Sequence, residues 1–279
     1  MIDAVYTIDV STFPLPYESL QLEGPETADF LQRQLMNDVR LLREDGSSQW
    51  TGLLSAKGKV VHLFLLLRLR ADHYVAICPD QDAALLQAAL QRMLFRSKLK
   101  LSLLPQAEVW HVPQPANTSA SAQLHWQGER WLSWFEQAPS FPASAAPAQL
   151  GGLQQAWNLA DLEAGLVRLQ ETTRDEFTPQ MLGLERRKAF SLNKGCFPGQ
   201  EILARTHFLG KAKRGLQLLA CQGDVSCGSA ILCDQREVGR VVSDALAEKV
   251  LAVLPLEQPE PLSNPQATFT YLSPTWSAG

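Results

Sequence analysis

The stretch after residue 211 is a series of short segments rich in residues that favour β-strands. Gly, Asp and Pro separate the segments, which is typical of strands joined by tight turns. The segments cover residues 213–221, 229–233, 236–245, 248–256 and 267–272. This pattern predicts a small closed sheet or barrel.

The earlier part of the chain differs, because helical and strand-like patterns alternate in it. Residues 48–54 and 59–69 are apolar and β-compatible, and Gly58 in the intervening turn can supply unusual backbone angles. Residues 80–99 begin with aspartates and carry apolar residues at helical spacing, which predicts a helix with an Asp cap. Helices are also predicted over residues 26–42 and 152–166, and strands over 73–78, 99–105, 107–112 and 130–136. The alternation predicts an α+β or split βαβ unit.

Composition excludes a wholly disordered chain, since 46% of the 279 residues are hydrophobic and 19% are charged. The first residues lack a basic start followed by an apolar run, and His62 and Arg68 break the longest apolar stretch. Neither a signal peptide nor a membrane span is therefore expected. Five scattered cysteines, an odd number, favour reduced thiols in the cytoplasm.

Residues 193–201 read Asn-Lys-Gly-Cys-Phe-Pro-Gly-Gln-Glu and place a cysteine in a tight turn. Gly195 and Gly199 permit backbone conformations closed to other residues, and Pro198 fixes one dihedral angle, so a defined loop is expected. A helical pattern resumes directly afterwards, which places Cys196 just ahead of a helix N-terminus. The helix dipole there favours a thiolate.

Positive charge gathers around this loop. Residues 185–214 carry a local charge of +6 in a chain whose net charge is −4. The basic residues are Arg186, Arg187, Lys188, Lys194, Arg205, Lys211, Lys213 and Arg214. Such a run indicates either a site for an anionic ligand or a solvated surface. For Cys196 the two alternatives are a functional thiol and a buried residue in a turn that joins two domains.

The sequence KGCFPGQEILART, followed by GKAKRGL, resembles the K-G-C-[FY]-x-G-Q-E-x-x-A-R pattern of the YgfZ family. Members of this family are folate-binding relatives of the glycine-cleavage T-protein, an aminomethyltransferase. Similar stretches occur at residues 30–39, 55–60, 162–166 and 176–185. The resemblance extends from about Tyr17 onwards and is weakest between residues 113 and 150, where Pro/Ala/Ser-rich residues 113–122 and 138–148 predict loops or linkers.

The resemblance implies an α+β fold with T-protein-like N-terminal α+β subdomains and a C-terminal β-barrel. Residues 1–112 would form the first subdomain and residues 113–210 a second, shortened one that contains the cysteine motif. Residues 211–279 would form the barrel.

The resemblance also implies site residues. Cys196 would be the functional thiol, with Lys194, Glu201 and Arg205 around it, while Gly195, Gly199 and Gln200 shape the loop. Tyr17, Trp157 and Glu163 would contact tetrahydrofolate or a derivative. Such a ligand needs aromatic walls, a carboxylate at the pterin edge and cations for its glutamate tail. Core packing is the alternative for the two aromatic residues, and a capping or surface role for Glu163.

One departure separates the chain from true aminomethyltransferases. Those enzymes carry an aspartate in the strand after the first-domain turn, whereas no acidic residue lies between Lys57 and Arg70 here. Aminomethyltransferase chemistry is therefore not expected, and whether the protein is an enzyme stays open. Lys57 and Lys59 fit the branch without transferase activity, or are simply exposed turn residues.

Two other patterns are interpreted as structural. Cys221, Cys227 and Cys233 follow a C-x5-C-x5-C spacing that matches no common zinc or ferredoxin motif, so no metal site is predicted. His207 follows Cys196 by eleven residues, and a catalytic pair would require the two to meet in space.

The resemblance favours a cytoplasmic folate-binding accessory protein that supports assembly or repair of iron–sulfur enzymes, including those that modify tRNA. A folate-dependent one-carbon transferase acting on tRNA or protein is the alternative. A third hypothesis is a binding module whose basic residues make a weak contact with tRNA. Folate and iron–sulfur client enzymes are the expected partners, and no membrane is expected.

Overall fold

The computed structural model describes residues 12–112, 120–127, 130–139, 147–208, 210, 212–274 and 276. Most of the two predicted linkers, and Lys211, lie outside these residues. None of the described helices is long and apolar enough to cross a membrane.

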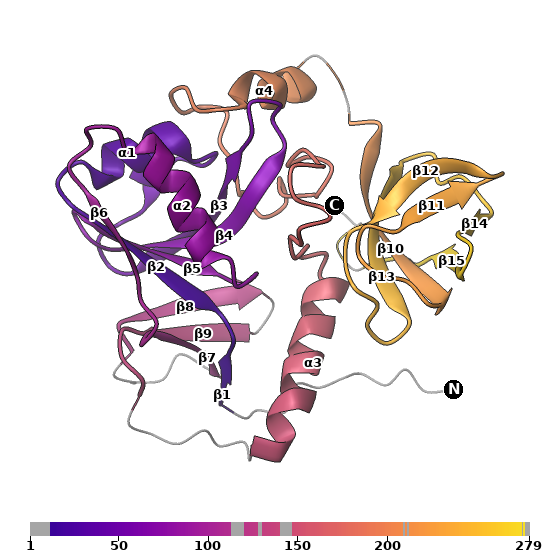
Figure 1. Cartoon of the computed structure of the whole chain (residues 1–279), viewed down its shortest axis with the longest axis horizontal. Helices are drawn as coiled ribbons and strands as arrows, with labels where there is room; N and C mark the ends of the chain where they lie inside the picture. The colour runs from indigo at the N-terminus through magenta and orange to yellow at the C-terminus, as the bar shows by residue number, and fades with distance from the viewer. Residues whose placement is uncertain are drawn as a thin grey trace. The chain divides into compact units, whose positions relative to one another are not determined.

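A five-stranded sheet contains the predicted hairpin. Its strands lie in the order β3 (Ser47–Leu54), β4 (Val60–Arg70), β5 (His73–Cys78), β2 (Glu18–Glu23) and β6 (Lys100–Leu103) (Figure 1). Gly58 in the turn between β3 and β4 has a φ of +69°, as the sequence predicts. The buried side chains of β4 and β5 form much of the core, because both strands consist largely of apolar residues.

A four-stranded antiparallel sheet follows the order β1 (Phe13–Leu15), β7 (Glu108–Val112), β9 (Arg130–Phe135) and β8 (Ala122–Gln127). Strand β8 has no counterpart among the predicted strands. Its sequence nevertheless carries a strand signal, because Leu124 and Trp126 are buried while His125 between them is exposed.

In the described part of the chain, four α-helices accompany the sheets: α1 (Thr27–Gln34), α2 (Ala83–Met93), α3 (Pro147–Glu163) and α4 (Gln200–Phe208). A short 3-10 helix, η1 (Val39–Leu41), follows α1. Helix α3 ends as predicted, since Gly165 just after it has a φ of +66°. Helix α4 begins immediately after Gly199, also as predicted.

Helix α2 packs on β2, β5 and β6, but it is shorter than predicted and its cap is different. Asp82 occupies the N-cap position without a side-chain capping hydrogen bond. Glu18 of β2 supplies the acceptor instead, since its Oε2 receives a hydrogen bond from Ala83 N at 2.9 Å. Leu85 is one of the apolar residues at helical spacing that predict this helix, yet its side chain is 58% exposed.

The predicted barrel is confirmed. It is a closed sheet in the order β10 (Arg214–Gly223), β13 (Lys249–Pro255), β12 (Arg236–Val241), β11 (Ala230–Cys233), β14 (Leu262–Ser263) and β15 (Ala267–Tyr271). Its interior is apolar and includes Leu219, Ile231, Val241, Val250, Ala252, Leu254 and Phe269. Closure pairs both sheet edges, which removes the open strands that favour aggregation.

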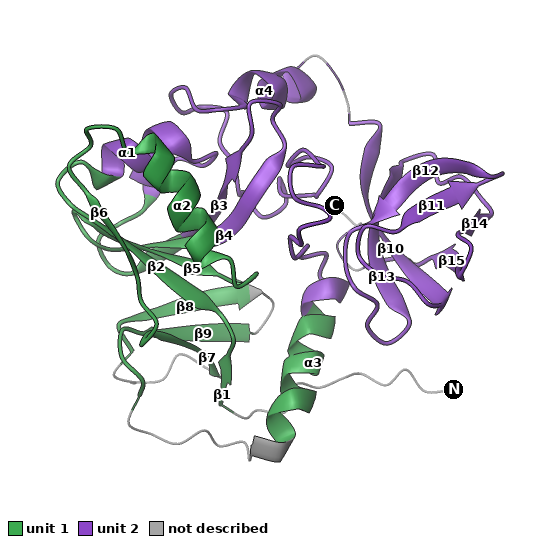
Figure 2. Ribbon diagram, viewed as in Figure 1, with its two compact units in different colours: residues 1–27, 42–48, 66–160 green, residues 28–41, 49–65, 161–279 purple. Residues whose placement is uncertain are grey.

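The chain divides into two compact units (Figure 2). The first comprises residues 1–27, 42–48 and 66–160, and the second comprises residues 28–41, 49–65 and 161–279. The second unit contains both the barrel and the cysteine motif. The three-part division at residues 112 and 210 stays a prediction.

Candidate functional site

The cysteine loop exposes several side chains, that of Cys196 among them, and buries others. Cys196 is exposed, whereas Lys194 and Phe197 on either side of it are only 8% and 7% exposed. Helix α4 starts at Gln200, and Gln200 N donates a hydrogen bond to Phe197 O at 3.2 Å. The loop is therefore anchored on both sides of an accessible thiol.

Lys194 forms the first anchor. Its Nζ donates hydrogen bonds to Leu35 O at 2.5 Å and Asn37 O at 2.9 Å, just after the end of α1. The ammonium also lies 4.9 Å from the ring centroid of Phe197. Carbonyls at the end of a helix lack partners and attract a cation, so Lys194 stabilises that end. Burial lowers the pKa of Lys194 to about 8.

Asn37, whose carbonyl accepts a hydrogen bond from Lys194, also binds β3 and the segment that precedes the cysteine loop. Its Nδ2 donates to Trp50 O of β3 at 2.8 Å and to Lys188 O at 2.7 Å. Ser191 N donates to Met36 O at 2.9 Å. Asn37 was not among the predicted site residues, and local patterns could not reveal it because its partners are remote in sequence.

Gly199 forms the second anchor, against the β3–β4 turn. Gly199 has a φ of +77°, and a Cβ there would lie 2.5 Å from Ser55 O. A Cβ on Gly58 would lie 2.8 Å from Cβ of Ile202 in α4. Both glycines thus permit the turn to approach the start of α4. Gly195 differs, because a Cβ at that position would meet nothing within 4 Å and its φ lies outside the left-handed region.

The remaining residues predicted around the thiol lie on α4. Gln200 Nε2 donates to Lys194 O at 3.5 Å, while Glu201 and Arg205 are exposed. His207 on the same helix lies 3.3 Å from Glu185 through its Nδ1. The geometry therefore gives Lys194 and Gln200 roles in holding the loop.

Tyr17 and Trp157, both predicted folate contacts, meet inside the first unit. Trp157 Nε1 donates to Tyr17 Oη at 2.7 Å, and the Trp157 side chain is fully buried. The ring of Trp157 also packs against Phe13 and His111, and the guanidinium of Arg130 lies 4.5 Å from its centroid. Burial lowers the pKa of His111, so the neutral imidazole is favoured within this aromatic cluster.

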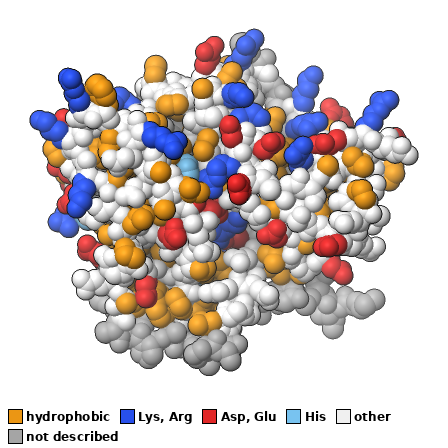
Figure 3. Space-filling view, in the orientation of Figure 1, with side chains coloured by type: hydrophobic (Ala, Val, Ile, Leu, Met, Phe, Trp, Pro, Cys, Tyr) orange, Lys and Arg blue, Asp and Glu red, His pale blue; other side chains and the backbone are white. Residues whose placement is uncertain are grey.

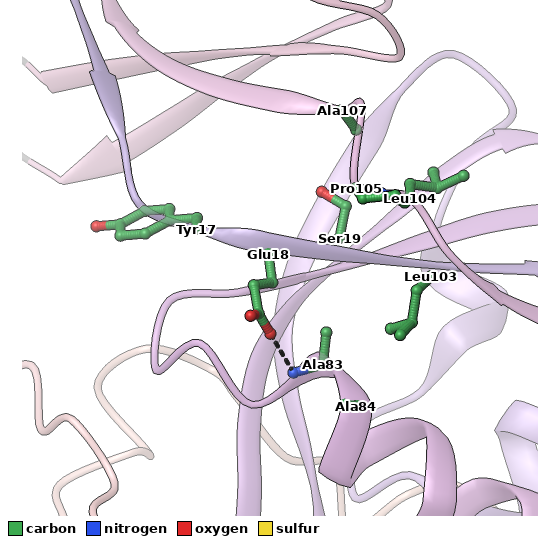
Figure 4. Close-up of a pocket in the computed structure, with 9 residues that line it drawn as sticks. All are labelled: Tyr17, Glu18, Ser19, Ala83, Ala84, Leu103, Leu104, Pro105 and Ala107. Carbon is green, nitrogen blue, oxygen red and sulfur yellow. Dashed lines mark hydrogen bonds between the residues drawn. The ribbon is translucent and has the colours of Figure 1, made fainter.

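A cavity of about 310 Å³ lies beside Tyr17 in the first unit. Its walls are mostly apolar, and Glu18 contributes the carboxylate that caps α2 (Figure 4). The ring of Tyr17 points away from the other lining residues in this view. The lining residues are Tyr17, Glu18, Ser19, Ala83, Ala84, Leu103, Leu104, Pro105 and Ala107.

Glu163, the third predicted folate contact, is the last residue of α3. It lies six positions after Trp157, so the two side chains leave the helix in different directions. Glu163 Oε1 accepts a hydrogen bond from Lys249 Nζ of β13 at 2.6 Å, and the Glu163 side chain is 41% exposed. A partly exposed carboxylate of this kind can accept hydrogen bonds from a ligand.

Several members of the basic run are used within the protein. Arg187 Nη2 donates to Ala164 O at 3.0 Å, and the guanidinium carbon of Arg186 lies 3.8 Å from the ring centroid of Trp276. Lys194 is buried as described above. On the face shown in Figure 3, the described Lys and Arg side chains are scattered among acidic ones. No single cationic patch stands out among the described residues on that face.

The C-x5-C-x5-C cysteines occupy separate parts of the barrel region. Cys221 lies on β10, Cys227 lies before β11, and Cys233 ends β11. Within the described part of the chain, no three His, Cys, Asp or Glu side chains are grouped so that they could hold a metal ion.

The fold and the site together define a class of protein. No family model matches the sequence. The solved structure of aminomethyltransferase T of the glycine cleavage system from Bartonella henselae matches 94% of this chain and 84% of its own, with a TM-score of 0.68 and 16% identity. The protein therefore has the T-protein fold.

Curated relatives give the family within that class. A tRNA-modifying protein YgfZ from Sodalis glossinidius is 30% identical over 251 residues, which cover 75% of this chain and 73% of the relative. The corresponding protein from Colwellia psychrerythraea is 28% identical over 243 residues, covering 78% and 72%. The chain belongs to the YgfZ family, and the resemblance found in the sequence is confirmed.

Proposed function

We propose that this protein is a cytoplasmic, folate-binding accessory protein that supports the assembly or repair of iron–sulfur enzymes, including enzymes that modify tRNA. Its family membership and its T-protein fold support a folate ligand and a link to tRNA modification. Cys196 is the functional thiol of this proposal, and Tyr17, Trp157 and Glu163 belong to the folate site.

One observation carries the role of Cys196: the loop exposes the thiol and is anchored at Lys194 before it and at Gly199 after it. Lys194 binds main-chain carbonyls just after α1, Phe197 is buried, and Gly199 lies against the β3–β4 turn. A cysteine with a merely structural role would be expected inside, since cysteine is among the most buried residue types. An exposed thiol on an anchored loop can contact a partner protein or a cluster without unfolding of the loop.

The residues proposed for folate differ in what they can contribute. Trp157 is fully buried and holds the Tyr17 hydroxyl, so we assign it to positioning Tyr17. Glu163 retains a partly exposed carboxylate for a ring edge. The sequence between Lys57 and Arg70 contains no carboxylate for the aminomethyltransferase reaction, which favours binding over that chemistry.

The thiol is tested by complementation of a strain that lacks the gene. Cys196→Ala and Cys196→Ser should fail to restore the activity of iron–sulfur enzymes that modify tRNA. Cys233→Ala, which changes a partly exposed cysteine of the barrel, should restore it and serves as the matched control. Full rescue by both Cys196 variants would remove the thiol from the proposal.

Folate binding is tested by thermal-shift titration with tetrahydrofolate. A ligand that binds the native state raises the unfolding temperature with the ratio of its concentration to the Kd. Trp157→Phe is a better variant than Trp157→Ala, which would cost about 3–5 kcal/mol of stability by itself. The absence of any shift would exclude folate, and turnover of a one-carbon folate would favour the transferase alternative.

A further inference from the structure

Trp276 lies next to the end of α3, in a slot formed by Gly165 and Arg186. Its Nε1 donates a hydrogen bond to Glu163 O at 2.8 Å. The guanidinium carbon of Arg186 lies 3.8 Å from the ring centroid, so the cation covers one side of the indole. Gly165 lies against the ring as well. The indole is only half-buried, in contrast to the fully buried Trp157.

Two glycines lie against the indole and the guanidinium. Gly165 has a φ of +66°, and a Cβ there would lie 2.8 Å from Cε2 of Trp276. Gly183 has a φ of +65°, and a Cβ there would clash with Nη2 of Arg186. Arg186 Nε donates to Gly183 O at 3.3 Å, which holds the guanidinium in place. A side chain at either glycine would take space that the indole or the guanidinium occupies.

The polar groups at the slot suit a nitrogen heterocycle. Glu163 offers its main-chain carbonyl as an acceptor, and its carboxylate is ion-paired with Lys249 at 2.6 Å. Arg186 offers a cation to the ring face. A flat heteroaromatic ring with N–H donors could make each interaction that the indole makes, and it could add hydrogen bonds to the carboxylate.

We propose that this slot binds the flat heteroaromatic ring of the ligand, and that Trp276 is a built-in competitor which the ring must displace. The inference rests on the proposed function, because the pterin of tetrahydrofolate is the ring in question. Among the described residues, a hydrogen bond to Glu163 O and a cation–π contact with Arg186 hold Trp276, and the ligand can replace both. The apparent affinity is then reduced by the fraction of molecules in which the slot is filled.

Affinity measurements test the competition. Calorimetric titration with tetrahydrofolate should give a Kd for Trp276→Ala that is lower than that of the parent by on the order of tenfold. Phe208→Ala is the matched control, because it removes a 69% exposed aromatic side chain of α4 in the same unit. This variant should bind like the parent protein.

Fluorine NMR tests whether tetrahydrofolate displaces the Trp276 indole in the parent protein, where no substitution alters the stability. The protein is labelled with 5-fluorotryptophan, and Trp276→Phe identifies the resonance of Trp276. Saturating tetrahydrofolate should move that resonance to the position of a solvent-exposed indole.

The outcomes separate the two proposals. If the parent and Trp276→Ala bind with equal Kd and the Trp276 resonance stays in place, the competitor role is wrong and folate binding stands. If neither protein binds tetrahydrofolate, the proposed function fails, and the competitor role fails with it. Tighter binding by the variant together with a displaced resonance supports both.

Discussion

Gly199 lies directly against Gly58: a Cβ on Gly199 would be 2.9 Å from the Cα of Gly58 and 2.5 Å from Ser55 O. The β3–β4 turn and the start of α4 therefore approach each other at two residues that lack side chains. This contact fixes the backbone three residues after the exposed thiol of Cys196. The fold thus uses the turn to hold the cysteine loop.

Gly199→Ala should destabilise the protein by about 1–3 kcal/mol, because the new methyl group meets the Ser55 carbonyl and the φ of +77° is strained for alanine. Urea unfolding followed by circular dichroism measures the loss. Gly195→Ala is the control and should stay within about 0.5 kcal/mol of the parent, since its Cβ meets open space. Equal losses in the two variants would contradict the anchoring role of Gly199.

Lys194 should make the free energy of unfolding depend on pH in the alkaline range. Burial lowers the pKa of Lys194 from 10.5 to about 8. Between pH 8 and pH 10.5, Lys194 is therefore protonated in the unfolded chain and deprotonated in the folded one. The free energy of unfolding should therefore rise with pH across this window, by at most about 3 kcal/mol. Below pH 8 the cost of the buried charge is fully present.

Urea unfolding of the parent and of Lys194→Met, at pH values on either side of the window, checks this prediction. The methionine variant lacks the titrating group but keeps a chain of similar length. The stability of the parent relative to the variant should increase as the pH rises. Parallel pH profiles would show that Lys194 does not titrate in this range.

The five thiols should react with iodoacetamide in the order of their exposure. Cys196 should be alkylated first, and Cys78 last, because Cys78 is fully buried and burial raises the pKa of its thiol. Mass spectrometry of peptides after timed quenching gives the order. Labelling in denaturant is the control and should remove the difference, while modification of Cys78 ahead of Cys196 would contradict the placement of the loop.

Glu163→Gln and Lys249→Met should distinguish the role of the Glu163 carboxylate from the role of its ion pair with Lys249. Both remove the Glu163–Lys249 ion pair, and each should cost less than about 1 kcal/mol because both side chains are partly exposed. Only Glu163→Gln should weaken tetrahydrofolate binding, on the order of tenfold, if the carboxylate contacts the ligand. Equal loss of affinity in both variants would assign the effect to the ion pair.

The sequence predicts the elements whose signals are local. The β3–β4 hairpin follows from two apolar runs around Gly58, and the end of α3 follows from Gly165. The barrel follows from its strand-like segments and turn residues, and the loop before α4 follows from Pro198 and Gly199. These features depend on backbone preferences of neighbouring residues, which a single sequence displays.

Tertiary structure alone decided which of the selected side chains remain accessible. Charge and position place Lys194 beside the thiol, yet its ammonium binds carbonyls after α1. Aspartates precede α2, yet Glu18 of strand β2 caps this helix. Trp276 reaches the end of α3 because Gly165 and Arg186 form a slot there. Each of these pairings joins residues remote in sequence, and the packing that selects them leaves no periodic local signal.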